Sequence, residues 1–170
     1  MLCDGVVTLD AFTLADIDAH VAGEDDEMAR RFGWWPKRST PETVRTAIER
    51  WTDDWKHGGT TRVFAVRDAI TRELVGHCEL RLKPERIAHA SYSTVQHARR
   101  RGFASRALAV MTAWAFRELD ISRIELYIEP DNVGSRAVAV RAGFHEQEIL
   151  RSHLPIGDEF RDAIVYVKLG

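Results

Sequence analysis

The chain has 170 residues, 45% of them hydrophobic, which suits one domain whose core is large enough to fold without disulfides or metals. Its 24 basic and 26 acidic residues give a net charge of −2, a balance that argues against a general nucleic-acid binder. The two cysteines lie far apart, and no apolar run approaches the ~20 residues that cross a bilayer. We therefore expect one soluble, cytoplasmic domain over residues 1–170, with no metal and no membrane partner.

Hydrophobic periodicity, capping residues and turn residues predict the secondary structure. Thr40 followed by Pro41 is a helix start, and Gly58 is a stop for the same helix. In chain order, the expected elements are a strand at 6–9, helices at 13–22, up to 33–36 and from 40 to 58, strands at 62–67, 73–82 and 87–95, a helix at 103–119, a strand at 123–129, a helix at 132–142, and strands at 144–150 and 161–169.

This order is not the strict strand–helix alternation of a doubly wound fold. We expect an α+β fold in three layers, with a mixed, mostly antiparallel sheet and helices on both faces. The passage from residue 87 to 142 should place one pair of strands side by side and parallel, with a right-handed crossover.

The most specific chemical signal is the loop QHARRRGFA at residues 96–104, between a predicted strand and a predicted helix. A helix start offers unpaired N–H groups and a positive dipole end, which together suit an anion such as phosphate. Gly102 allows a close approach of the backbone, and the arginines add charge. The nucleotide motifs GxxxxGK[ST] and GxGxxG are both absent.

The spacing Arg99-x-x-Gly102-x-Ala104 resembles the signature of the GCN5-related N-acetyltransferase (GNAT) superfamily. A second stretch, from Asn132-x-x-Ser135 to the Ala-Gly-Phe at 142–144, is similar to the branch that contains the RimJ/RimL-like ribosomal-protein-alanine acetyltransferases. The resemblance covers nearly the whole chain. It implies a splayed pair of parallel strands, acetyl-CoA or a related acyl-CoA as cosubstrate, and transfer of the acyl group to a primary amine.

The resemblance also implies roles for individual residues. The strand before the loop would pair with the pantetheine arm, and the N–H of Thr94 or Val95 would face the thioester oxygen. Asn132 would bind the arm near the sulfur, and Ser135 would protonate the departing thiolate; simple N-capping is the alternative for both. The residues implied in cosubstrate binding are Tyr92, Thr94, Val95, Arg99, Arg100, Arg101, Gly102, Phe103, Ala104, Asn132 and Ser135.

The chain departs from the family pattern where the general base is concerned. His89 stands where many relatives carry a glutamate, and it is our first choice as the base, with a structural role as the alternative. Glu79, His77 and a water relay are rivals. In addition, Tyr127 stands where another branch has its glutamate, and Ala139 stands where some relatives have a donor tyrosine.

The acceptor side is expected within residues 1–60, which carry twelve acidic and seven basic residues, while residues 61–170 form the acyl-CoA-binding core. Trp34 and Trp35, together with Glu79, are candidates for binding a small-molecule amine or a peptide N-terminus. Two other readings stay open: a non-catalytic acyl-CoA sensor and an RNA-binding module built on the arginine cluster. A monomer and a homodimer are equally compatible with the sequence.

Overall fold

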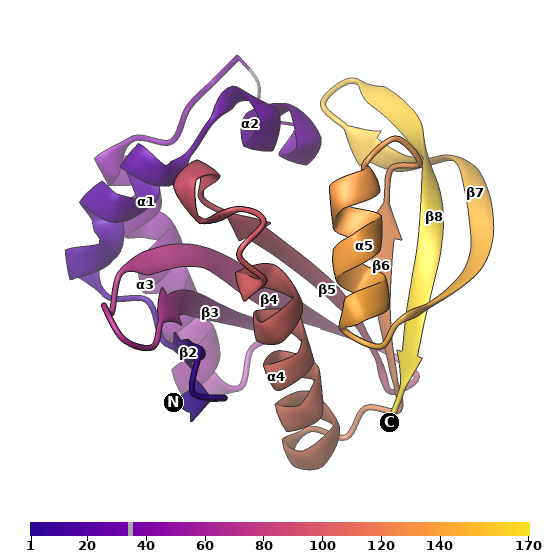
Figure 1. The fold of residues 1–170 in the computed structure, drawn as a ribbon, viewed down its shortest axis with the longest axis horizontal. Coiled ribbons are helices and arrows are strands. Elements are labelled where there is room, and N and C mark those ends of the chain that lie inside the picture. Colours follow the sequence, from indigo (N-terminus) through magenta and orange to yellow (C-terminus); the bar gives the residue numbers. More distant parts are fainter. Residues whose placement is uncertain (34–35) are drawn as a thin grey trace.

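A computed structural model describes residues 1–33 and 36–170 of the chain. Eight strands form one sheet in the order β1-β2-β3-β4-β5-β6-β8-β7, and only the β5–β6 pair is parallel (Figure 1). The strands are β1 (Leu2–Cys3), β2 (Val7–Asp10), β3 (Thr61–Asp68), β4 (Leu74–Lys83), β5 (Ile87–Thr94), β6 (Arg123–Ile128), β7 (His145–Ile156) and β8 (Glu159–Leu169). The α-helices are α1 (Ile17–Gly23), α2 (Asp26–Phe32), α3 (Pro41–His57), α4 (Phe103–Glu118) and α5 (Val133–Arg141).

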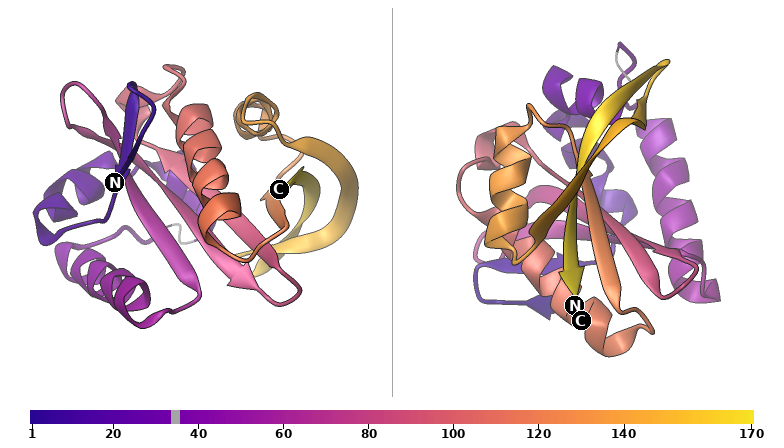
Figure 2. Two further views of the ribbon diagram at one scale, coloured as in Figure 1. Left: turned by 90° about the horizontal axis from the view of Figure 1, so that it is seen from below. Right: turned by 90° about the vertical axis from the view of Figure 1, so that its right-hand side faces the viewer.

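Helices cover both faces of the sheet, so the predicted three-layer α+β fold is confirmed (Figure 2). The larger core lies under α4 and α5 and includes Leu108, Met111 and Ile124. A smaller core lies under α1 and α3, where Ile17 and Ile48 pack on the opposite face. Among the described residues, none of the helices has the length and apolar character that a membrane crossing requires.

The sheet divides into two halves at the parallel pair. β5 and β6 pair only through Ile87–His89 and Arg123–Glu125. Beyond these residues β5 continues alongside β4 up to Thr94, while β6 continues alongside β8 up to Ile128. Each strand follows its antiparallel partner, and the two therefore separate toward their carboxyl ends.

Two parts of the secondary structure differ from the prediction. β1 has two residues, which is too short for any alternation of polar and apolar side chains to be seen in the sequence. β7 continues to Ile156 instead of ending at 150, as one arm of a hairpin with β8. Most side chains of β7 are exposed on both faces, so the added residues lack the period-two hydrophobic pattern from which strands are predicted.

A buried ion-pair network fixes the start of the α1 segment to the sheet. The Arg67 guanidinium on β3 lies 2.8 Å from Asp16 and 2.8 Å from Asp10, and its side chain is 12% exposed. Burial opposes ionisation of Asp16, but hydrogen bonds from Arg67 and Thr13 outweigh it, so the pKa of Asp16 is lowered. The carboxylate therefore stabilises the folded state above its ordinary pKa, and this contribution disappears as the pH falls through the folded value.

Replacing Asp16 by Asn should lower the free energy of unfolding by roughly 1–3 kcal/mol at pH 7, because the buried guanidinium loses a charged partner. Urea unfolding at pH 7 and pH 3 measures the difference from the native protein, which should narrow at pH 3. Asp18→Asn, on the exposed side of α1, is the control and should have little effect. An equal difference for Asp16→Asn at both pH values would contradict the assignment.

Candidate active site

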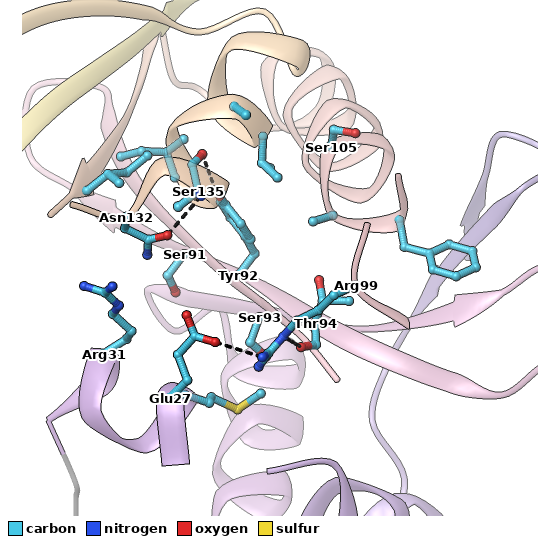
Figure 3. Close-up of a pocket in the computed structure, with 18 of the residues that line it drawn as sticks. Glu27, Arg31, Ser91, Tyr92, Ser93, Thr94, Arg99, Ser105, Asn132 and Ser135 are labelled. Carbon is cyan, nitrogen blue, oxygen red and sulfur yellow. Dashed lines mark hydrogen bonds and ion pairs between the residues drawn. The ribbon is translucent and has the colours of Figure 1, made fainter. Parts of the chain in front are cut away.

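A cleft of about 400 Å³ opens where β5 and β6 separate. Its walls are β5, the loop before α4, the first turn of α4, helix α5, the end of β6 and helix α2 (Figure 3). The polar and charged side chains that line it are those of Glu27, Arg31, Ser91, Tyr92, Ser93, Thr94, Arg99, Arg100, Ser105, Tyr127, Glu129, Asn132, Ser135 and Arg141.

The open edge of β5 offers backbone hydrogen-bonding groups to the cleft. The N–H of Val95 donates to the carbonyl of Val75 on β4, at 3.0 Å. In an antiparallel ladder, successive residues direct their N–H and C=O groups to opposite sides, so those of Thr94 and Tyr92 point toward the open side. The Val95 alternative for the thioester contact is therefore wrong, because its N–H is already bonded within the sheet. Thr94 keeps that position.

The loop and the start of α4 form the second wall. Gly102 caps α4 with a φ of +84°, a left-handed conformation that glycine adopts without strain. Arg100 also has a positive φ, of 60°. The Arg99 N–H donates to the Gln96 carbonyl at 3.3 Å, so the backbone donors available for an anion begin after Arg99. Phe103 is buried and anchors the helix in the core, while Ala104 lines the cleft.

Three arginines of the cluster pair with acids on other elements. Arg99 lies 2.6 Å from Asp25 and 2.9 Å from Glu27 at the start of α2. Arg101 turns away from the cleft, toward Asp68, and its guanidinium lies over the ring of Phe103. Arg106 pairs with Asp4 at 2.9 Å. Because these side chains point to separate carboxylates, they do not form the continuous basic surface that RNA binding requires.

Asn132 and Ser135 stand together at the start of α5. The Asn132 side-chain oxygen accepts the Ser135 N–H at 3.0 Å, which is the N-cap that the sequence left as an alternative. The Ser135 hydroxyl does not cap the helix; it lies 2.6 Å from the hydroxyl of Tyr92. Burial raises the pKa of Tyr92 to about 12, so its phenol keeps its proton at neutral pH. This Tyr92–Ser135 pair was not foreseen, because the sequence does not show that the two side chains meet.

Helix α2 forms the wall opposite α5 and carries charged and apolar side chains. The Arg31 guanidinium lies 3.1 Å from Glu129, a buried residue at the end of β6, and Arg161 on β8 lies 2.9 Å from the other oxygen of Glu129. The apolar residues of this end are Met28, Phe32 and Leu154. Trp34 and Trp35 lie outside the described residues. None of these α2 contacts was predicted, since they join residues about 100 positions apart.

His89 and Glu79 do not line the cleft. His89 lies in the paired part of β5, with Nε2 3.5 Å from Glu125 and its ring against Tyr127. Burial, followed by the nearby Lys83, lowers the pKa of His89, so the ring is neutral at pH 7. Glu79 on β4 is buried and pairs with Arg81. With a strand rise of ~3.3 Å per residue, the α-carbons of His89 and Thr94 are roughly 16 Å apart.

Comparisons with known proteins identify the family. Residues 7–145 match the model of the acetyltransferase (GNAT) domain. Two similar curated proteins come from Bacillus subtilis. The probable N-acetyltransferase YjcK is 36% identical over 62 residues, which are 36% of this chain and 34% of that protein. The uncharacterized N-acetyltransferase YoaA is 28% identical over 132 residues, which are 76% of this chain and 73% of that protein.

Solved structures share the fold at low sequence identity. RimL, a ribosomal L7/L12 α-N-protein acetyltransferase solved in complex with coenzyme A, has a TM-score of 0.84 at 19% identity, over 99% of this chain and 96% of its own. Spermidine N-acetyltransferase from Vibrio cholerae, solved with CoA and spermine, has a TM-score of 0.79 at 20% identity, over 98% of this chain and 96% of its own. Since the family model covers most of the chain and both motifs line one cleft, the chain belongs to the GNAT acetyltransferase family.

Proposed function

We propose that this protein uses acetyl-CoA to acetylate a primary amine, by direct attack of the amine on the thioester while both substrates are bound. The observation that carries the proposal is the open edge of β5 beside the N-terminus of α4, in one cleft. An extended amide chain can pair with the open edge of β5, and a diphosphate can bind at the N-terminus of α4.

The residues present fit acetyl-CoA. The N–H and C=O of Tyr92 face the open side and can pair with the pantetheine amides. The Thr94 carbonyl already accepts from Arg99 Nε at 3.2 Å, so Thr94 offers only its N–H. The N–H groups of residues 100–104 can hold the pyrophosphate, with added charge from Arg100 and Arg141 at the cleft. Asn132 uses its oxygen for the helix cap, which leaves its NH₂ group to donate to the pantetheine arm. Acetyl-CoA is expected, and a related acyl-CoA would make the same contacts.

The polar groups also suit the chemistry of acyl transfer. The Thr94 N–H can donate to the thioester oxygen as negative charge develops there. The Ser135 hydroxyl can give its proton to the departing thiolate while it takes the proton of the Tyr92 hydroxyl, 2.6 Å away, and water in the cleft then restores the Tyr92 proton. A thiolate with a thiol pKa near ~8.5 leaves readily, so this proton transfer should have a modest effect on the rate. The role of His89 as general base stays a prediction, and at its distance from Thr94 bridging waters would be needed.

The charges of the acceptor end favour a single amine, such as a protein N-terminus, over a polyamine. Glu27 is paired with Arg99, and Glu129 is paired with both Arg31 and Arg161. A polycation would have to displace these arginines to reach the two carboxylates. One α-amine with an uncharged peptide behind it needs no such exchange, and the apolar side chains of Met28, Phe32 and Leu154 can contact its first residues.

Incubation with acetyl-CoA and a panel of amines tests the proposal. The panel consists of peptides with a free N-terminal alanine or serine, the same peptides with a blocked N-terminus and an internal lysine, and spermine. Free thiol release and product mass should show transfer to the peptide α-amine. Preferential acetylation of spermine would contradict the acceptor class. Tight binding of acetyl-CoA without transfer to any amine would favour the sensor reading instead.

Replacing Gly102 by Val should lower acetyl-CoA affinity at least tenfold, because a side chain at this cleft position forces the loop out of its left-handed conformation. Gly58→Val is a matched control. Gly58 also caps a helix with a positive φ, of 71°, and an added Cβ meets nothing within 4 Å at either glycine. Both variants should lose about 1–2 kcal/mol of stability, and only Gly102→Val should lose affinity by calorimetry. Equal affinities would contradict the loop assignment.

Replacing Ser135 by Ala should lower kcat a few-fold and leave acetyl-CoA affinity nearly unchanged, because the thiolate leaves readily without an acid. Asn132→Ser keeps an oxygen that can cap α5 but removes the NH₂ donor, so it should weaken acetyl-CoA binding without destabilising the protein. Steady-state kinetics, calorimetry and thermal unfolding separate these effects. Unchanged kinetics and affinity in both variants would mean that the two residues serve only the helix.

A further inference from the structure

A serine–histidine pair connects the cleft to the interior of the protein. Ser93 on β5 lines the cleft, and its hydroxyl lies 2.9 Å from Nδ1 of His77 on β4. The two residues stand directly opposite each other in the antiparallel ladder. Figure 3 shows Ser93 next to Thr94 on β5, near the side chain of Glu27 that rises from α2. Its hydroxyl therefore lies one residue from the N–H assigned to the thioester oxygen.

A second, very small cavity continues from this pair toward the surface. Its volume is about 10 Å³, which is room for a single water molecule. His77 and Ser93 line it, together with His20 and Glu24. The rings of His20 and His77 are stacked with their centroids 6.0 Å apart. His20 is partly exposed, so the line of polar groups reaches solvent beside α1.

We propose that Ser93, His77 and His20 form a proton relay that takes the proton from the bound amine and releases it at the surface beside α1. This inference rests on the proposed acetyltransferase function. The ammonium N–H bond breaks and its proton goes to the Ser93 oxygen, while the Ser93 proton passes to Nδ1 of His77. His77 gives up its Nε2 proton through one water to His20. The amine then holds a lone pair for attack, and His20 holds the proton until bulk water removes it. Before the next turnover, Nδ1 of His77 returns its proton through Ser93 to water in the emptied cleft, and Nε2 takes a proton from the water of the small cavity, which restores the starting tautomer.

The surroundings of His77 suit a group that passes a proton on and does not store it. Desolvation, followed by the nearby His20, lowers the pKa of His77 to about 3, so the ring is neutral at working pH. From α2, the Phe32 ring packs 6.3 Å from His77 and shields it from the cleft. Burial lowers the pKa of His20, and the charges of Glu24 and then Asp16 offset only part of this effect, so His20 readily releases a proton to bulk water.

The tautomer of His77 tests the relay without any turnover. In protein labelled with ¹⁵N-histidine, ring-nitrogen NMR signals that disappear in His77→Asn belong to His77. Between pH 5 and 8 we expect a neutral ring with its proton on Nε2 and with Nδ1 as the acceptor from Ser93. A proton on Nδ1 would overturn the relay, because Ser93 would then have nowhere to pass its own proton.

Kinetics with acetyl-CoA and a peptide carrying a free N-terminal alanine test the role in the reaction, with spermine as a second acceptor. His77→Asn places an oxygen near the position of Nδ1, so Ser93 keeps a partner while transfer through the ring is lost. Ser93→Ala and His77→Asn should each lower kcat/KM at least tenfold at pH 7. The loss should shrink toward pH 9, where free amine forms unaided. The dissociation constant for acetyl-CoA should change less than twofold.

Two further variants make the comparison specific. His57→Asn changes an exposed histidine of α3 and should behave like the native protein. His89→Ala distinguishes the relay from the rival base, because the relay alone predicts that this variant keeps most of the activity. If the native protein is active and Ser93→Ala or His77→Asn keeps full activity from pH 6 to 9, the relay is overturned and the proposed function is not. A loss of activity confined to His89→Ala would overturn the relay in the same way. A native protein that acetylates none of the amines overturns the proposed function.

Discussion

The function of this fold depends on the short length of one strand pairing. β5 and β6 share three residue pairs and then follow different antiparallel partners. If the parallel pairing continued to Thr94, the backbone groups of β5 that face the cleft would be bonded to β6. The separation leaves an extended strand edge inside the protein, where an amide-containing ligand can complete the ladder. Exposed edges of this kind invite pairing with other chains, and here the edge lies inside a cleft.

The surrounding residues keep this open edge from collapsing. The Arg99 side chain donates from Nε to the Thr94 carbonyl at 3.2 Å, while its guanidinium nitrogens hold Asp25 and Glu27 of α2. On the far side, Arg31 of the same helix reaches Glu129 and Asp131 at the end of β6. Helix α2 is thereby tied to both halves of the divided sheet. Seven residues would be a weak helix alone, and these ion pairs hold it as a wall of the cleft.

The sequence predicted those parts of the site that depend on local chemistry. The loop at 99–104 could be found because arginine and glycine just before a helix indicate an anion-binding turn. Asn132 could be found because asparagine is a favoured N-cap residue. The same reasoning could not show that the Tyr92 hydroxyl meets Ser135, or that Ser93 meets His77, because these contacts depend on strand register. It also left Thr94 and Val95 equivalent, and one backbone hydrogen bond to Val75 separates them.

Strand register also explains why a plausible base in the sequence does not line the cleft. His89, Ser91 and Ser93 share one face of β5, so the alternating pattern alone makes them equal candidates to face the acceptor. The structure distinguishes them by their partners on β4, which are Arg81, Glu79 and His77 in that order. His89 lies opposite Arg81, where β5 and β6 are still paired, and charged side chains surround it. A serine opposite a half-buried, neutral histidine, at the open end, has a partner that can accept its proton. The chemistry of the cleft is thus set by which residue of β4 stands across from each residue of β5.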